Sequence, residues 1–240
     1  MKLDILAFGA HPDDVELGAG GTILREISMG RKVGIVDLTR GELGTRGSAN
    51  ERDEESANAS EILGIEFRAN LAFRDGFFLN DEHHQLEVIK YIRYYRPEII
   101  ICNAISDRHI DHGKGSELIK DASFLSGLRK IETFWENEKE AQTPWRPKAV
   151  YHFIQDRYIK PDFIINITDF IDQKMKAVKA YKSQFYNPAS EDPETEISSA
   201  KFLEFVISRS IEFGRPAGYD FAEGFTIDRI SGVKSLMDLD

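Results

Sequence analysis

The chain of 240 residues has a single cysteine and no long hydrophobic run. Cys102 cannot form an internal disulfide, and its place in the apolar segment EIIICNA predicts that it is buried. No stretch approaches the roughly 20 apolar residues that a membrane span needs. The first apolar segment, ILAFGA, is too short for a signal peptide and has no cleavage site. These absences predict a cytoplasmic protein without a membrane partner.

Basic residues are fewer than acidic residues in this chain. Lysine and arginine together number 31, against 41 aspartates and glutamates, which gives a formal net charge of −10 and a sequence pI near 5.2. Such an acidic chain lacks the field that attracts phosphate groups, so it is a poor general binder of nucleic acid or anionic membranes. A small anionic substrate is compatible with this charge if a few arginines gather in its pocket.

Short apolar runs alternate with helix-period segments over the first two-thirds of the chain. The runs predict strands at 3–10, 32–39, 65–71 and 98–104. The segments that follow them predict helices at about 15–30, 50–64, 86–96 and 111–128. This βαβα order favours a mostly parallel sheet with helices on both faces, which is a three-layer α/β sandwich.

The last third of the chain is less regular. It predicts two strands and two helices, at 149–154, 162–168, 169–185 and about 197–213. The acidic stretch NPASEDPETE predicts a loop. No predicted linker is long enough to separate two domains. We therefore predict one domain over 1–240, with a core over about 1–135 and a C-terminal extension of strands and helices over about 146–240.

The loop after the first predicted strand reads AHPDD and contains His11, Asp13 and Asp14. In open parallel sheets ligands bind at the carboxyl ends of the strands, and an imidazole beside two carboxylates is unusual there. Asp13 followed by Glu16 also fits a capping box, in which either aspartate caps the next helix and His11 has no special role. The loop predicts a metal site only if further ligands lie beside it.

A dinucleotide-binding protein, such as a regulator, is a second interpretation of the same region. Gly18, Gly20 and Gly21 open the next helix, and Asp37 ends the second strand where a ribose-binding acid would lie. However, the two aspartates of AHPDD would repel a pyrophosphate at that helix N-terminus. The glycines also come a turn or more too late in the sequence.

The further ligands follow the fourth predicted strand, in SDRHIDHGKG. His109 and His112 are three residues apart, so at the start of a helix they project toward one side. The alternative is a polar loop in which Asp111 caps the helix. Because this loop lies at the same sheet edge as AHPDD, the two loops together supply His, Asp and His as ligands and leave one aspartate and one histidine over.

Zinc in catalytic sites takes three protein ligands of this kind and keeps one position for water. The same set resembles a 2-His-1-carboxylate iron site, so Fe²⁺ is the alternative metal. A non-catalytic metal-binding protein is a further alternative, although the remaining aspartate and histidine would then have no reason to flank the ligands.

The sequence AHPDDVELGAGGT, followed later by HIDHGKG, resembles the LmbE-like, or PIG-L, deacetylases, whose signatures are AHPDD and H-x-D-H. The resemblance extends to AYKSQF and YDFAEGF and implies a Rossmann-like fold, a small N-acetyl sugar substrate and a homo-oligomer. GELGTRGSANERDEESANASEILG and NLAFRDGFF are similar to the branch of the family that acts in bacillithiol synthesis. That branch implies N-acetylglucosaminyl-malate as the substrate, with another N-acetylglucosamine conjugate as the alternative.

The resemblance also implies a role for each residue of the two motifs. The implied ligands of a Zn²⁺ ion are His11, Asp14 and His112. Asp13 matches the general base, which takes a proton from metal-bound water. His109 matches the histidine that assists at the substrate carbonyl, and Asp111 matches the carboxylate partner of that histidine.

N-acetylglucosaminyl-malate carries two carboxylates, so an acidic protein that binds it needs arginines at the site. Arg52, Arg46 and Arg108 are the candidates, because the planar guanidinium donates two hydrogen bonds to a carboxylate at once. Arg52 lies in ERDEES, where the family has a substrate-site arginine, and is the first choice. A solvated surface arginine is the alternative for each.

Overall fold

The computed structural model describes residues 1–238, whose strands form one sheet in the order β3-β2-β1-β4-β5-β7-β6. Neighbouring strands from β3 to β5 are parallel, which confirms the predicted mostly parallel sheet. Because strands from both parts of the chain join this sheet, we propose that the chain forms one domain. The strands are β1 (Ile5–Gly9), β2 (Val33–Thr39), β3 (Phe67–Phe73), β4 (Ile99–Cys102), β5 (Ala149–Phe153), β6 (Phe163–Asn166) and β7 (Ala222–Ile227).

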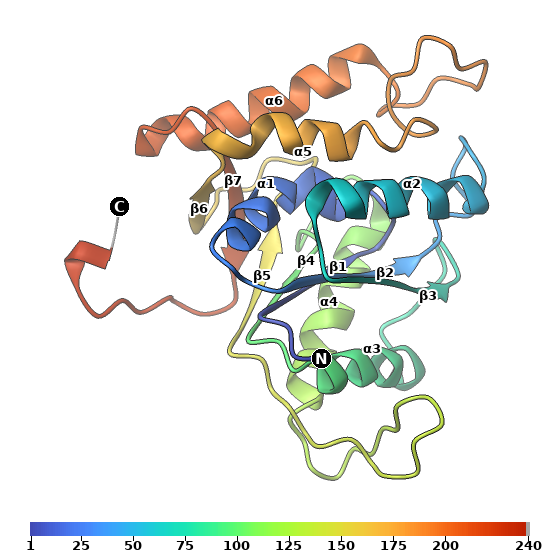
Figure 1. Ribbon diagram of the computed structural model, residues 1–240, viewed down its shortest axis with the longest axis vertical. Coiled ribbons are helices and arrows are strands. Elements are labelled where there is room, and N and C mark those ends of the chain that lie inside the picture. Colours follow the sequence, from blue (N-terminus) through green and yellow to red (C-terminus); the bar gives the residue numbers. More distant parts are fainter. Residues whose placement is uncertain (239–240) are drawn as a thin grey trace.

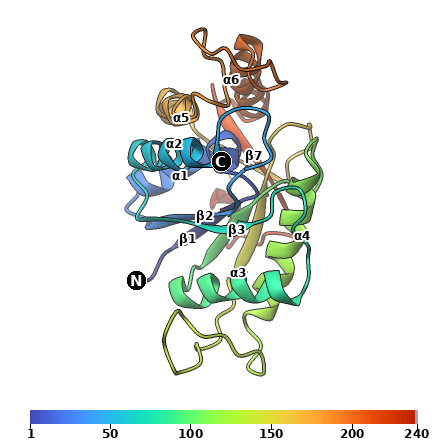
Figure 2. The ribbon, with the colours of Figure 1, turned by 90° about the vertical axis from the view of Figure 1, so that its right-hand side faces the viewer.

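Helices cover both faces of the sheet, which confirms the predicted three layers (Figures 1 and 2). One layer contains α1 (Asp14–Ser28), α2 (Ala49–Leu63), α5 (Ile171–Val178) and α6 (Ala200–Gly214). The other contains α3 (Glu82–Tyr95) and α4 (Ile110–Leu125). Successive side chains of β1 alternate between the two faces: Leu6 and Phe8 join one apolar core, and Ile5 and Ala7 the other. None of the helices in residues 1–238 is long and apolar enough to cross a membrane.

Two of the glycines in α1 allow this helix to pack closely on its neighbours. A Cβ atom on Gly18 would lie 2.1 Å from the ring of Phe153 in β5. A Cβ on Gly21 would lie 2.8 Å from Ile167. Gly18 and Gly21, two of the three glycines that suggested a dinucleotide loop, are therefore needed where α1 touches the rest of the chain.

Strand β7 was not predicted from the sequence. It runs antiparallel between β5 and β6 and completes the sheet. Its sequence AEGFTI lacks a clear apolar alternation, and Glu223 in its second position is buried. This carboxylate accepts hydrogen bonds from the backbone N–H groups of Gly21 (2.9 Å) and Thr22 (2.7 Å) and pairs with Lys174 at 2.7 Å. Contacts with distant residues, rather than a local pattern, hold the strand in place.

The helix predicted over 169–185 is shorter in the structure, where α5 ends at Val178. Beyond it, the N–H and hydroxyl groups of Ser183 both donate to Glu55 at 2.7 Å, so this backbone does not continue the helix. The hydroxyl of Tyr181 donates to Glu16 at 2.9 Å. Met175, Val178, Tyr181 and Phe185 are still buried, but Glu55 of α2 accepts the hydrogen bond of the Ser183 N–H that a longer helix would have used.

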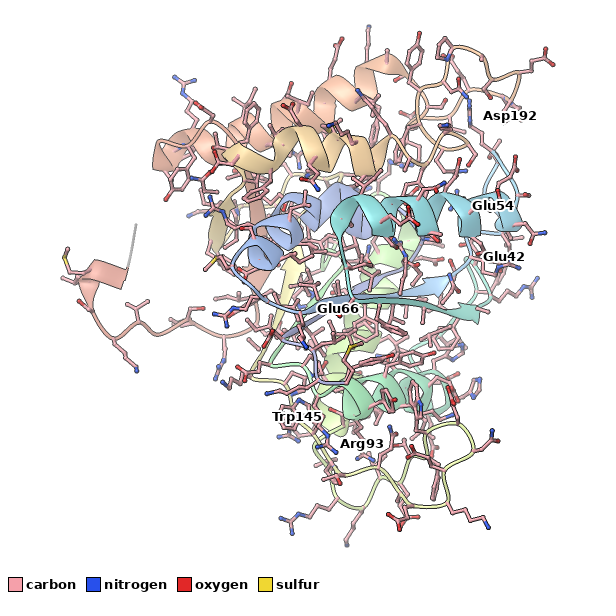
Figure 3. The ribbon with its side chains drawn as sticks, viewed as in Figure 1. Glu42, Glu54, Glu66, Arg93, Trp145 and Asp192 are labelled. Atoms are coloured by element: carbon pink, nitrogen blue, oxygen red, sulfur yellow. The ribbon has the colours of Figure 1, made fainter. Side chains whose placement is uncertain are left out.

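The parallel strands end at one edge of the sheet, and Figure 2 views the molecule from that side. The loops after β1 to β5 meet there. Figure 3 shows Glu42 on this side of the molecule, and its carboxylate accepts a hydrogen bond from the N–H of Asp75 at 2.8 Å. This bond links the loop after β2 to the loop after β3.

Candidate active site

The loops after β1 and β4 bring the two sequence motifs together, as the parallel sheet predicted. Oδ1 of Asp14 lies 3.2 Å from Nε2 of His112, although the residues are almost a hundred positions apart. The ring centroids of His11 and His109 are 4.6 Å apart. One buried cluster therefore contains both halves of the expected site.

Asp14 is held by hydrogen bonds on both of its carboxylate oxygens. Oδ2 accepts from the N–H of His11 (2.9 Å) and from Nδ2 of Asn103 (3.0 Å), and Oδ1 accepts from Nε2 of Gln155 (2.7 Å). Burial raises the pKa of Asp14, but the positive charge of His112 and the bonds from both histidines hold this pKa well below its usual range. Asp14 is therefore an ionised, fixed carboxylate.

His112 lies between two carboxylates. Its Nε2 faces Asp14, and its Nδ1 lies 2.7 Å from Oδ2 of Asp107. Burial lowers the pKa of His112, but attraction to Asp14 and the bonds to Asp107 and Asp14 outweigh it and raise the pKa to about 9. The Asp107 bond leaves Nε2 as the nitrogen that faces the cluster.

His11 has a comparable environment. Its Nδ1 lies 3.5 Å from Oδ2 of Asp14, and its Nε2 lies 3.0 Å from Oδ1 of Asp75 and 3.5 Å from Oδ2 of Asp111. Burial opposes protonation, but these carboxylates raise the pKa of His11 well above its usual value. Both histidines that were expected to bind a metal thus lie where the protein stabilises positive charge.

These residues fit a divalent metal ion. Ring nitrogens of His11, His109 and His112 all lie within 4.8 Å of one another, and the Asp14 carboxylate contacts two of these rings. Imidazole and carboxylate are the ligands of catalytic zinc and of 2-His-1-carboxylate iron sites. A divalent cation would supply the positive charge that the imidazolium protons otherwise provide, so its binding displaces those protons.

Asp13 does not cap α1, which argues against the plain capping interpretation. It occupies the N-cap position with φ 112° and ψ −26°, and its side chain makes no capping hydrogen bond. Such a backbone conformation is strained for a residue with a Cβ, and strain of this kind is concentrated at functional sites. Burial raises the pKa of Asp13 to about 7. The positive charge of Arg52 opposes this shift, and the negative charge of Asp14 adds to it. Its carboxylate can therefore take up and release a proton near neutral pH.

His109 and Asp111 lie beside the ligands but interact differently from the expectation. His109 is the N-cap of α4, and its Nδ1 accepts a hydrogen bond from the N–H of Asp111 at 3.3 Å. Burial, and then the charges of His11 and His112, lower the pKa of His109. The Asp111 carboxylate instead accepts from the N–H of Gly76 at 2.7 Å. Because Nδ1 accepts from the backbone of Asp111, Nε2 is the ring nitrogen of His109 that is left to carry a proton toward the cavity.

A cavity of about 600 Å³ opens over this cluster, a size that holds a small-molecule ligand. All three predicted substrate arginines, Arg46, Arg52 and Arg108, line it. Arg46 donates from all of its guanidinium nitrogens to the carbonyls of Ser183 and Pro193 and to the hydroxyl of Ser190. It thereby anchors the loop after α5 in the cavity wall.

Arg52 is more closely connected with the reacting groups. Its Nη2 donates to Gln184, and its positive charge acts on the pKa of Asp13. Gly41 makes room for it, because a Cβ there would lie 1.9 Å from Nη1 and φ is +63°. Arg108 is more exposed, and its Nε donates to Oδ2 of Asp156 at 3.0 Å.

Asp37, the acidic residue that would bind the ribose in a dinucleotide site, has a structural role instead. Asp37 is buried and accepts two hydrogen bonds from Arg68, at 2.8 and 3.0 Å. Arg68 also pairs with Glu16 at 2.6 Å. Because Asp37 is engaged in this internal network, the structure gives no support to the dinucleotide interpretation.

Comparisons with known proteins agree with this geometry. Residues 6–123, which contain both motifs, match the family of GlcNAc-PI de-N-acetylases, PIG-L. A solved structure of a conserved protein from Thermus thermophilus is 36% identical, has a TM-score of 0.83 and covers 97% of this chain and 98% of its own. The chain belongs to the PIG-L family. The family match and the deacetylases among its relatives indicate that it is a hydrolytic N-deacetylase.

Two deacetylases that are named for their substrates are similar to most of the chain. Diacetylchitobiose deacetylase of Thermococcus kodakarensis is 26% identical over 230 residues, which cover 92% of this chain and 81% of the relative. The probable N-acetyl-α-D-glucosaminyl L-malate deacetylase 2 of Bacillus anthracis is 26% identical over 208 residues, covering 78% and 84%.

Four polar residues of the site were not predicted from the sequence. Asn103 and Gln155 bind Asp14, Asp107 binds His112, and Asp75 binds His11. All four follow strands at the same sheet edge as the two motifs. That position was the available signal, but their individual partners depend on the order of the strands.

Proposed function

We propose that this PIG-L protein removes the N-acetyl group of an N-acetylglucosamine conjugate, with a metal held by His11, Asp14 and His112. The observation that carries the proposal is the convergence of these side chains, with Asp13 beside them, at the floor of one cavity. When bound, a divalent metal such as zinc supplies a Lewis acid that polarises the amide carbonyl and acidifies water.

The remaining steps belong to the protein's own groups. Asp13 accepts a proton from the attacking water, since its raised pKa matches the working pH of a general base. The same carboxyl group then donates that proton to the nitrogen as the C–N bond breaks, which releases acetate and the free amine. Nε2–H of His109 donates a hydrogen bond to the carbonyl oxygen while it gains negative charge.

For the conjugate, we propose N-acetylglucosaminyl-malate, the substrate of the bacillithiol branch. Its support is the similarity to the Bacillus anthracis relative and the position of Arg52 beside Asp13 in the cavity wall. Diacetylchitobiose is the alternative substrate, supported by the longer match to the Thermococcus enzyme.

The test is the release of primary amine by zinc-loaded protein from three compounds: N-acetylglucosaminyl-malate, diacetylchitobiose and N-acetylglucosamine. We expect the highest kcat/KM on the malate conjugate, and loss of turnover on all three with a chelator. A higher kcat/KM on diacetylchitobiose would refute the malate conjugate as the substrate, but the proposed deacetylation reaction would still stand. Turnover that persists at full rate in metal-free protein would refute the role of the metal.

A further inference from the structure

The loop that follows β5 contacts one proposed metal ligand, Asp14, directly and also contacts Asp107, the partner of a second ligand. Gln155 donates from Nε2 to Oδ1 of Asp14 at 2.7 Å. The N–H of Arg157 donates to Oδ1 of Asp107 at 2.8 Å, and the N–H of Asp156 approaches Oδ2 at 3.4 Å. Because Asp107 orients the ring of His112 and Gln155 orients Asp14, movement of loop 155–157 would disturb both ligands.

This loop is connected to helix α6 by Arg209. Nη2 of Arg209 donates to the carbonyl of Asp156 at 2.9 Å. The guanidinium lies 4.9 Å from the ring centroid of Phe205 and 5.6 Å from that of Phe213, so it is held by aromatic faces of its own helix.

The Arg209 side chain is only 11% exposed, and its Nε and Nη1 make no hydrogen bond with any described residue. Glu212 supplies a charge 3.3 Å from Nε. The bond to Asp156 is therefore the one hydrogen bond that this largely buried guanidinium donates within residues 1–238, beside its ion pair with Glu212. Helix α6 packs on β7 in the same layer as α1 and α5 (Figure 1), so the contact connects this helix with the loops at the sheet edge.

We propose that Arg209 is a positioning residue for the metal site. It acts through the backbone of Asp156, which with Arg157 supports Asp107, and through the adjacent Gln155. The inference rests on the proposed metal site. Mutation of residues that hydrogen-bond to metal ligands typically lowers metal affinity by about 10- to 100-fold. Such residues fix the orientation of the ligands before the ion binds.

The test replaces Arg209 with methionine, which keeps an apolar stem against the rings but cannot donate to Asp156. We expect at least ~10-fold weaker binding of Zn²⁺ and Co²⁺, and an altered visible absorption spectrum of the Co²⁺-loaded protein. Arg209→Lys, which keeps a donor and a positive charge, should restore most of both. Arg215→Met is the matched control, since Arg215 is exposed just beyond α6 and does not line the cavity.

A double-mutant cycle with Asp107→Asn separates positioning from general destabilisation. If Arg209 acts through Asp107, the loss in metal affinity of the double variant should be clearly smaller than the product of the two single losses. Independent multiplication of the losses would overturn the proposed connection. Gln155→Met is a second variant, which should weaken metal binding even if Arg209→Met does not fold.

The two proposals fail in different ways. Wild-type protein that binds neither Zn²⁺ nor Co²⁺ tightly would refute the proposed metal site itself. Wild-type protein that binds both, together with an Arg209→Met variant of unchanged affinity and Co²⁺ spectrum, would overturn only the role of Arg209.

Discussion

Oδ2 of Asp107 lies 2.7 Å from Nδ1 of His112, while Oδ1 of Asp14 lies 3.2 Å from Nε2 of the same ring. The imidazole is therefore held at both nitrogens by carboxylates. In metal-free protein this arrangement favours the imidazolium form, and with a metal it offers Nε2 in a fixed orientation.

The environment of His112 predicts that the metal-free protein loses stability as the pH rises. Its pKa is about 9 in the folded chain against 6.5 for an ordinary histidine, so its contribution is complete below pH 6.5 and is lost as the pH rises through 9. The raised pKa of His11 acts in the same direction. The full contribution of His112 is on the order of 3 kcal/mol.

Urea unfolding of chelator-treated protein at pH 6.5 and 9.5 measures this change. His112→Asn is the control and should show a smaller difference between the two pH values. Equal differences for the wild type and the variant would mean that His112 is not charged in the metal-free protein.

Asp13→Asn should keep the metal but lose at least ~100-fold in kcat, because asparagine cannot accept the proton of the attacking water. Asp13 is not among the proposed ligands, so zinc content per chain should equal that of the wild type. The measurement combines amine release with metal analysis of the same sample. Nearly normal turnover in a zinc-loaded variant would remove Asp13 from the role of general base.

Arg52→Ala should reduce kcat/KM for N-acetylglucosaminyl-malate much more than for N-acetylglucosamine, by about 10-fold or more, because a charged hydrogen bond to a carboxylate is lost. Arg46→Ala is the comparison. Since the nitrogens of Arg46 bind the loop of Ser183, Ser190 and Pro193, this variant should lower stability and affect both substrates alike. Equal losses on both substrates for Arg52→Ala would argue against carboxylate recognition by Arg52.

Gly18→Ala should destabilise the protein by about 1–3 kcal/mol, because its new methyl group would overlap Phe153. Gly20→Ala is the matched control in the same helix, where the nearest atom to an added Cβ is 3.5 Å away. That substitution should be neutral or stabilising by up to about 1 kcal/mol, since alanine favours the helix. Thermal unfolding compares the two variants, and similar behaviour would contradict the packing role of Gly18.

The residues that could be predicted are those whose position follows from one local rule. AHPDD comes directly after one apolar strand and HIDH follows another after the short loop NAISDR, so a parallel sheet brings His11 and His112 to the same edge. Asp75 and Gln155 also follow strands, but they stand among other polar loop residues, in FRDGFF and FIQDRY, that form no recognisable ligand pattern. Their importance depends on which strands are neighbours, and the sequence pattern does not contain that order.

The missed strand and the shortened helix have a related explanation. Glu223 would be unfavourable in a buried strand without Lys174 and the N–H groups of α1, which lie far away in the sequence. Ser183 leaves the helical pattern because Glu55 of α2 accepts both of its donors. In both places, polar contacts between distant segments override the local preference.

The position of β7 has a consequence for how the protein is made. β6 pairs with β7, which in turn pairs with β5, so residues 163–166 join the sheet only through residues 222–227. On the ribosome, β1 to β5 can assemble while the later segments are still being synthesised, but β6 must wait for the last strand to emerge. We therefore expect nascent chains that stop before residue 222 to expose β6 and the unpaired side of β5 to chaperones, proteases and aggregation.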